Sequence, residues 1–143
     1  MAFNTLAWKL WGLSVLALAL KMLVLALLTS RQRFAKRVFA SPEDYAALRL
    51  QPQERDSDVE RYRRAHRNDL ENILPFFIVG AIYAATGPSD LGAWLCLVGF
   101  ALARGLHTVF YLRSAMPHRT IAYGYGYFAT LWMILASARS LLS

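Results

Sequence analysis

Hydrophobic residues gather in four long blocks that are separated by more polar segments. The blocks cover residues 6–28, 70–86, 91–112 and 120–142. A helix of about 20 residues crosses a hydrocarbon core of ~30 Å, so each block has about the length of a membrane span. Two of the three connections are short, which favours antiparallel neighbours. The pattern predicts an all-α integral membrane protein, a four-helix up-down bundle that forms one domain over residues 1–143.

A cleaved signal peptide is the alternative explanation for the first block, because the start of this block is positively flanked. The apolar run of residues 6–28 is longer than the core of a signal peptide, however, and Lys21 lies within it. No small-residue cleavage pattern follows Leu28. We therefore expect this block to stay in the membrane as the first span.

The composition agrees with a membrane protein. Hydrophobic residues make up 57% of the 143 residues, and the mean hydropathy is +0.32, which is more apolar than a soluble domain of this size requires. The formal net charge of +7 would suit a nucleic-acid partner, but four spans leave no separate module for one, so we expect none. The one cysteine, Cys96, excludes an intrachain disulfide, and we expect no metal site.

Basic residues are distributed unevenly between the two sides of the expected bundle. Residues 29–67 contain ten Lys and Arg, and Arg113 and Arg119 fall on the same side after two further crossings, whereas residues 87–93 contain none. Lys and Arg near the ends of spans favour the cytoplasmic side. Both termini of this multi-pass chain should therefore face away from the cytoplasm, in the endoplasmic reticulum of a eukaryote or the inner membrane of a bacterium.

Residues 29–57 form the long cytoplasmic connection in this arrangement. Ser41 suits the N-cap of a short helix over residues 42–48, whose first residue is a proline. A second capping pattern at residues 56–60 predicts that the next helix begins well before the membrane. That helix contains Pro75, where a missing backbone hydrogen bond predicts a kink or local water.

Three of the four expected helices carry polar residues on one face. These residues are Arg64, Arg67, Asn68 and Glu71 on the second helix, Arg104, His107 and Tyr111 on the third, and Arg119, Tyr123 and Tyr127 on the fourth. Spacings of three, four and seven or eight residues keep such side chains on a single face. A charge at membrane depth must be paired or must face a cavity. Because arginines outnumber acids among these residues, we expect a site for a small anionic ligand near the cytoplasmic face.

Two explanations remain open for Arg104. It can form a structural ion pair, with Asp69 or Glu71 as the carboxylate, or it can contact a ligand. His107 can likewise act as a hydrogen-bonding residue between helices instead of taking part in chemistry. The sequence does not decide between these roles.

Arg119 and Thr120 lie where the fourth helix is expected to begin. The helix dipole and the free backbone amides of a first turn favour an anion at that end of a helix. We therefore expect these two residues to lie against the anionic ligand.

The longest recognisable motif is the run VERYRRAHRNDLENILPF at residues 59–76. It closely resembles the signature of the MAPEG family, the membrane-associated proteins in eicosanoid and glutathione metabolism. Residues 39–44, residues 87–88, residues 104–112 and the chain from Arg119 onward are similar to this family as well. Within it, the chain looks most like the branch that contains microsomal glutathione transferases and prostaglandin E synthases.

The resemblance implies a homotrimer of four-helix subunits, with one glutathione held between neighbouring subunits near the cytoplasmic face. An adjacent subunit would contribute Arg33 to that site. The residues that would line it, carried over by position, are Arg64, Arg67, Asn68, Glu71, His107, Tyr111, Arg119 and Tyr123.

The chemistry of glutathione suits these residue types. Its two carboxylates can be held bidentately by arginines, and its ammonium can be received by Glu71 and Asn68. Its thiol is the nucleophile, and lowering a thiol pKa by ~2 units takes roughly 2.7 kcal/mol. Arg119 is the expected catalytic residue for this step. Thr120 is expected to assist it, since it keeps the hydroxyl of the serine that the synthases of this family have at this position.

The function implied is a glutathione transferase that adds the thiolate to hydrophobic or lipid-derived electrophiles from the bilayer, as in detoxification, with reduction of lipid hydroperoxides as a further activity. A glutathione-dependent isomerase like prostaglandin E synthase, which would belong to eicosanoid metabolism, is one alternative. A non-catalytic lipid-binding scaffold is another, although the presence of Arg64, Asn68, Glu71, Tyr111 and Arg119 argues against it.

Overall fold

The computed structural model describes residues 5–143, and every regular element in this range is a helix. The elements are α1 (Thr5–Lys36), α2 (Pro42–Ala47), α3 (Ser57–Ala85), α4 (Asp90–Ala93), the π-helix η1 (Trp94–Val98), α5 (Gly99–Leu112) and α6 (His118–Leu142). The prediction of an all-α protein is therefore confirmed. Residues 1–4 of the predicted domain lie outside the described range.

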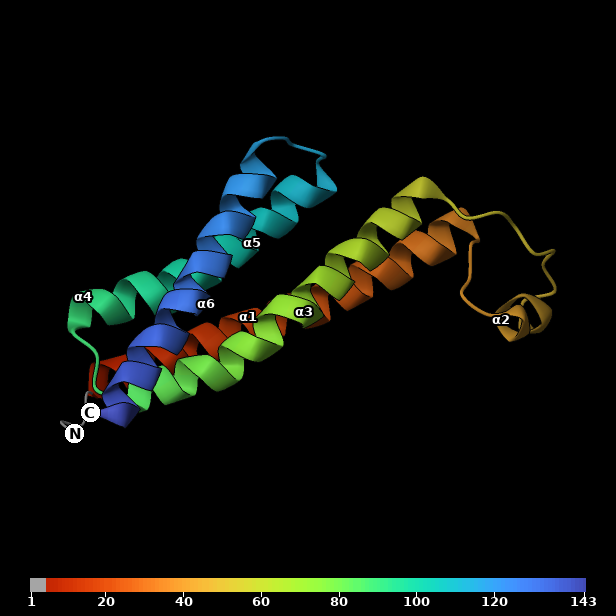
Figure 1. The fold of residues 1–143 in the computed structure, drawn as a ribbon. Coiled ribbons are helices and arrows are strands. Elements are labelled where there is room, and N and C mark those ends of the chain that lie inside the picture. The colour runs from red at the N-terminus through yellow and green to blue at the C-terminus, as the bar shows by residue number, and fades with distance from the viewer. Residues whose placement is uncertain (1–4) are drawn as a thin grey trace.

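The long helices pack in two pairs. In Figure 1, α1 runs beside α3 and α5 runs beside α6, and α3 joins the pairs through contacts with both α5 and α6. The start of α1, the end of α6 and the α3–α4 connection lie at one end of the molecule, and α2 lies at the other. Successive long helices thus run in opposite directions, as the short connections predict.

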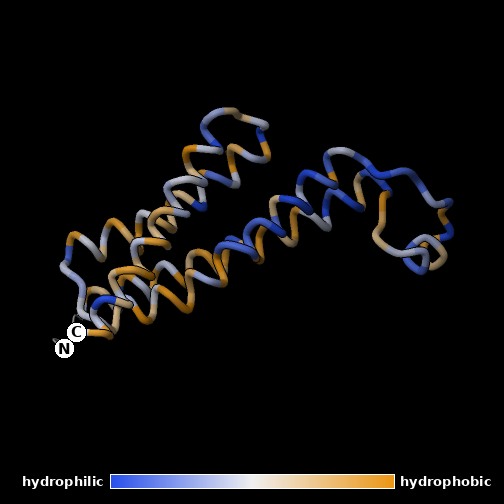
Figure 2. Tube along the Cα trace, viewed as in Figure 1, coloured by the Kyte–Doolittle hydropathy of each residue, from blue (hydrophilic) through white to orange (hydrophobic). Residues whose placement is uncertain are grey.

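The first helix is longer than the apolar block that predicted it. α1 has 32 residues, which corresponds to about 48 Å, and it continues for eight residues beyond the predicted limit at Leu28 before ending at Lys36. The added residues are largely polar. Figure 2 shows hydrophilic colours on this part of α1, on the adjoining half of α3 and around α2, and mainly hydrophobic colours toward the opposite end.

The expected caps of the connecting segment are partly confirmed. α2 occupies the predicted short helix, and Ser41 stands at its N-cap position with extended backbone but without a side-chain capping bond. Asp56 caps α3, because its Oδ1 accepts from the backbone N–H of Asp58 at 2.9 Å and of Val59 at 3.1 Å. The bond from Val59 is the main reason why the pKa of the Asp56 carboxyl lies below its ordinary value.

The core lies where the four long helices meet. Phe76 of α3 and Phe100 of α5 stack with ring centroids 4.1 Å apart, and Ile73, Leu97 and Met133 are completely buried around them. α3 remains one helix through Pro75, which lies on its exposed side. These contacts fix the rotation of α3, so that Asp69 points inward while Asn68 and Glu71 point toward the outer face or its edge.

Large apolar side chains also cover much of the outer surface. On α1, Leu13, Leu16, Leu20 and Leu27 are 62–71% exposed, and contiguous apolar surface of this kind indicates contact with lipid or protein. Among the described helices, α1 and the continuous helical segment over residues 90–112 are long and apolar enough to cross a membrane. In α3, all charged residues precede Asn72, and the rest of the helix is apolar.

The third apolar block is not a uniform α-helix, because the segment Trp94–Val98 near its start forms η1. π-helices expose backbone carbonyls to other partners, and two are used here. Tyr125 Oη of α6 donates to the carbonyl of Leu95 at 2.9 Å, and Ser14 Oγ of α1 donates to that of Leu97 at 3.3 Å. At Gly99, an added Cβ would collide with Tyr125 Oη and push this side chain away from its present position on the segment.

Candidate active site

A buried ion cluster joins three helices. It consists of Lys21 of α1, Asp69 of α3 and Arg104 of α5. Lys21 Nζ lies 2.6 Å from Asp69 Oδ1, and Arg104 Nη2 lies 3.3 Å from the same oxygen. Asp69 is 0% exposed and Arg104 is 1% exposed. The ion pair between Arg104 and Asp69, one of the two explanations left open by the sequence, is therefore present.

Pairing explains how these charges can exist among apolar helices. Leaving one buried ion without its partner destabilises a protein by about 3–5 kcal/mol. The cluster holds two cations against one carboxylate, and Thr108 Oγ1 adds a weak contact to Asp69 Oδ1 at 3.5 Å. Lys21 and Thr108 are members of the cluster that were not among the residues predicted from the sequence. A lysine within a long apolar block was the available signal, since such a residue needs a partner.

Arg104 also binds the neighbour of Asp69. Its Nη2 donates to Asn68 Oδ1 in a short hydrogen bond and to the backbone carbonyl of Asn68 at 3.3 Å. The side chain of Asn72 donates to the same carbonyl at 2.7 Å. One buried guanidinium thus contacts both an inward residue of α3 and the residue next to it on the outer face.

The outer face of α3 carries the polar stripe that the sequence predicts. Arg64, Arg67 and Glu71 are exposed, and Asn68 is half-buried. Glu71 and Pro75 line a groove of about 370 Å³, whose opposite wall is formed by α6 and includes Tyr123. The structure therefore brings Glu71 and Tyr123 to one groove, whereas Arg64 and Arg67 lie further along α3 toward α2.

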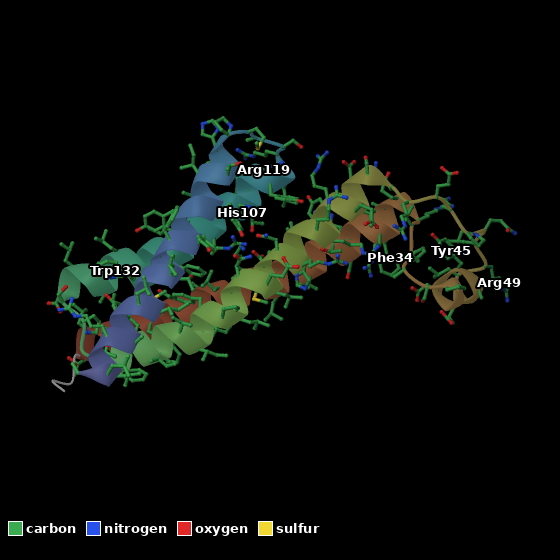
Figure 3. All side chains as sticks on the ribbon, in the orientation of Figure 1. Phe34, Tyr45, Arg49, His107, Arg119 and Trp132 are labelled. Carbon is green, nitrogen blue, oxygen red and sulfur yellow. The ribbon has the colours of Figure 1, made fainter. Side chains whose placement is uncertain are left out.

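Four further candidate residues lie together on α5 and α6. The His107 ring lies 5.6 Å from the ring of Tyr111 and 6.0 Å from that of Tyr123, measured between centroids. The guanidinium carbon of Arg119 lies 5.3 Å from the centroid of Tyr111, within the range of a cation–π contact. Figure 3 shows His107 and Arg119 on neighbouring stretches of these two helices.

The start of α6 differs from the expectation in one respect. The backbone N–H of Arg119 donates to the carbonyl of Ala115 at 3.2 Å, and that of Thr120 donates to the carbonyl of Pro117 at 2.9 Å. The prediction of free amides at these two residues is therefore wrong, because the preceding turn already satisfies them. Any anion held here must rely on side chains, chiefly on Arg119 and the exposed hydroxyl of Thr120.

Arg33 lies away from the other candidate residues of its own chain. It lines two pockets at the α2 end of the molecule, both together with Phe39 and one of them also with Phe34. In Figure 3, Phe34 and Tyr45 mark that end, whereas His107 and Arg119 lie on the α5–α6 pair. Arg33 can therefore reach such a site only in another subunit, which is the role that the family resemblance implies.

Known proteins identify the group to which this arrangement belongs. The model of the MAPEG family matches residues 11–139. The chain belongs to the MAPEG family. Within the residues that the structure describes, no group of three or more His, Cys, Asp or Glu side chains is placed to hold a metal ion.

Two kinds of enzyme are found among the relatives of this MAPEG chain. Prostaglandin E synthase of Macaca fascicularis is 46% identical over 110 residues, which cover 74% of this chain and 71% of the relative, and that of Homo sapiens is 44% identical over the same shares. Microsomal glutathione S-transferase 1 of Rattus norvegicus is 41% identical over 128 residues, which cover 85% of this chain and 83% of the relative. The predicted family and branch are confirmed.

Proposed function

We propose that this protein is a membrane-bound glutathione transferase that activates the thiolate of glutathione for attack on hydrophobic electrophiles. The observation that carries the proposal is the gathering of His107, Tyr111, Tyr123 and Arg119 on α5 and α6 in a MAPEG chain. The names of the relatives agree with the predicted enzyme class and with glutathione as the thiol, since one is a glutathione S-transferase. The same thiolate would serve in the reduction of lipid hydroperoxides.

Arg119 is the residue that stabilises the thiolate. Its Nε donates to Met116 Sδ at 2.9 Å, and its guanidinium carbon lies over the Tyr111 ring; thioether sulfur is only a weak acceptor. In the part of the chain that the structure describes, its Nη atoms have no hydrogen-bond partner, so their N–H groups remain for a ligand. The hydroxyl of Thr120 lies 3.5 Å from the same sulfur and can turn toward the thiolate.

The hydrophobic substrate enters from the lipid through a groove between α5 and α6. This groove has a volume of about 410 Å³ and is lined almost entirely by apolar side chains, among them Leu106, Phe110 and Ile121. His118, which directly precedes Arg119 at the start of α6, also lines this groove. A groove of this size and composition suits a small apolar molecule.

The functional unit is a homotrimer of four-helix bundles that each cross the membrane four times. Two observations support an oligomer. Arg64, Arg67 and Glu71 are exposed beside apolar helix surface, where charges need partners, and Arg33 cannot reach His107 within its own chain. Residues 29–57 would face the cytoplasm and both termini the opposite side, in the endoplasmic reticulum or a bacterial inner membrane.

The test is glutathione conjugation by detergent-purified protein. Wild type should bind glutathione and conjugate it to an aryl halide, and Arg119→Ala should lower turnover at neutral pH by about 100-fold, the effect of ~2 pKa units on the thiolate. Arg113→Ala is the matched control, because Arg113 is an exposed arginine of the same connection and should leave turnover unchanged. A wild type that neither binds glutathione nor turns over any substrate would support the scaffold instead.

A glutathione-dependent isomerase of the prostaglandin E synthase type is the second candidate. The identity to the Macaca fascicularis synthase, 46%, exceeds the 41% to the rat transferase, although the synthase match covers less of this chain. Three parallel assays separate the activities: an aryl halide, a lipid hydroperoxide and a prostaglandin endoperoxide. Preferred turnover of the endoperoxide, with little conjugation of the aryl halide, would support the isomerase function instead of the transferase function.

A further inference from the structure

The contact between Arg104 and Asn68 determines which way the Asn68 amide faces. A guanidinium has only hydrogen-bond donors, so the side-chain atom of Asn68 that meets Arg104 Nη2 must be the oxygen. Oxygen and nitrogen of an asparagine amide are normally assigned from such networks, and this partner permits only one assignment. The amide nitrogen of Asn68 therefore points away from Arg104.

Arg104 is itself held in place. Its Nη2 lies among three acceptors, namely the two oxygens of Asn68 and Asp69 Oδ1, which also binds Lys21. Turning the Asn68 amide over would bring its NH2 group against a cation that offers only donors. A charge-assisted hydrogen bond would be lost, which disfavours the turned amide by about tenfold or more.

The exposed part of Asn68 is consequently a donor. In the described part of the chain, its Nδ2 makes no hydrogen bond, and the residue is half-buried at the edge of the outer face of α3. Glu71 follows three residues later on this face and, when ionised, can only accept. One turn of α3 thus offers a donor and an anionic acceptor side by side, which matches a carboxylate and an ammonium on the same carbon atom.

We propose that Arg104 is a positioning residue that holds Asn68 Oδ1, so that Asn68 Nδ2 donates to the α-carboxylate of the γ-glutamyl group of glutathione while Glu71 receives the adjacent ammonium. The inference rests on the proposed function. It changes the expectation from the sequence, in which Asn68 and Glu71 both received the ammonium. Arg104 acts through Asn68, because its own side chain is buried.

Asn68→Asp tests whether the ligand group that meets Asn68 is a carboxylate or an ammonium. Aspartate keeps an oxygen for Arg104, so the fold should survive, but it replaces the outward donor by a second carboxylate oxygen. If the ligand group is a carboxylate, the Kd for glutathione in full-length purified protein should rise at least about tenfold. If it is an ammonium, the Kd should fall, which would overturn the proposal. Asn68→Ala is the comparison, because it removes the donor without adding a charge and should weaken binding less than Asn68→Asp.

A double-variant cycle tests the part played by Arg104. Arg104→Gln should weaken glutathione binding in the wild type but should add no further loss in the Asn68→Ala background, since both changes remove the same contact. Arg104→Lys, which keeps the charge beside Asp69, should restore part of the affinity and serves alone if Arg104→Gln does not fold. Additive losses would show that Arg104 does not act through Asn68.

Analogues of glutathione test which group of the ligand Asn68 contacts. Wild type should bind an analogue whose γ-glutamyl carboxylate is an amide at least about tenfold more weakly than glutathione, and Asn68→Ala should no longer distinguish the two. If Asn68→Ala discriminates as well as wild type, this inference fails while the proposed function stands. If wild type does not bind glutathione at all, both fail.

Discussion

The buried ion cluster predicts that Asp69→Asn is the most destabilising conservative substitution in this part of the fold. The substitution keeps the shape of the side chain but removes the carboxylate that contacts Lys21 at 2.6 Å and Arg104 at 3.3 Å. Removing one partner of a buried ion pair costs about 3–5 kcal/mol. The side chain of Lys21 is 18% exposed and can move toward water, so we expect the lower part of this range, ~3 kcal/mol, with Arg104 as the ion that remains unpaired.

The assay is reversible unfolding of the full-length protein from detergent micelles by a denaturing detergent, followed by circular dichroism. Asp58→Asn is the matched control, because Asp58 forms an exposed ion pair with Lys36 at 3.5 Å, and its loss should cost less than ~1 kcal/mol. A third variant, Lys21→Met, leaves Arg104 paired with Asp69 and balances the charges of the cluster. It should therefore cost less than Asp69→Asn.

A double variant tests whether Lys21 and Asp69 interact in the folded protein. Lys21→Met with Asp69→Asn removes one cation together with the carboxylate, so it should be no less stable than Asp69→Asn alone. Simple addition of the two single losses would mean that Lys21 and Asp69 do not interact in the folded protein. Equal effects of Asp69→Asn and Asp58→Asn would likewise contradict the reasoning from burial.

Three further predictions follow from other parts of the structure. Arg119→Ala should raise the pKa of bound glutathione by about two units, measured by the ultraviolet absorbance of the thiolate; an unchanged pKa would exclude Arg119 as its stabiliser. Gly99→Ala should destabilise the protein by about 1–3 kcal/mol because its Cβ meets Tyr125 Oη, and Tyr125→Phe should relieve part of this loss in unfolding experiments. The Asp56 carboxyl has its pKa lowered in the folded state, so its stabilising effect is present above the unfolded pKa of about 3.9 and is lost as the pH falls through the folded value. Asp56→Ala should therefore lower the unfolding midpoint at neutral pH but not in strong acid.

The positions of the helices could be predicted because each depends on a local pattern. Apolar blocks of span length specified α1, the helical segment over residues 90–112 and α6, and spacing alone placed Arg64, Asn68 and Glu71 on one face of α3. The cap at Asp56 followed from the same local rules. Such features need no knowledge of which helices are neighbours, so a single sequence is enough to find them.

The contacts between helices could be predicted only in part. Asp69 was a candidate partner of Arg104 because buried charges must be paired, but the choice between Asp69 and Glu71 required the rotation of α3, which the packing of Phe76 on Phe100 sets. Lys21 was missed because nothing along the sequence gives the rotation of α1 relative to α3. The free amides at Arg119 were wrongly expected for a related reason, since the turn before α6 decides their partners.

Arg104 links the core of the fold to the proposed ligand site. On one side its guanidinium completes the cluster with Asp69, which holds α3 and α5 together within apolar surroundings. On the other side the same Nη2 fixes the Asn68 amide at the edge of the face where we place the ligand. A residue that acts on both sides cannot be optimised for stability alone, because replacing the cluster by apolar residues would also release Asn68. On the proposal above, the charged cluster, although costly among apolar helices, would also support the binding site.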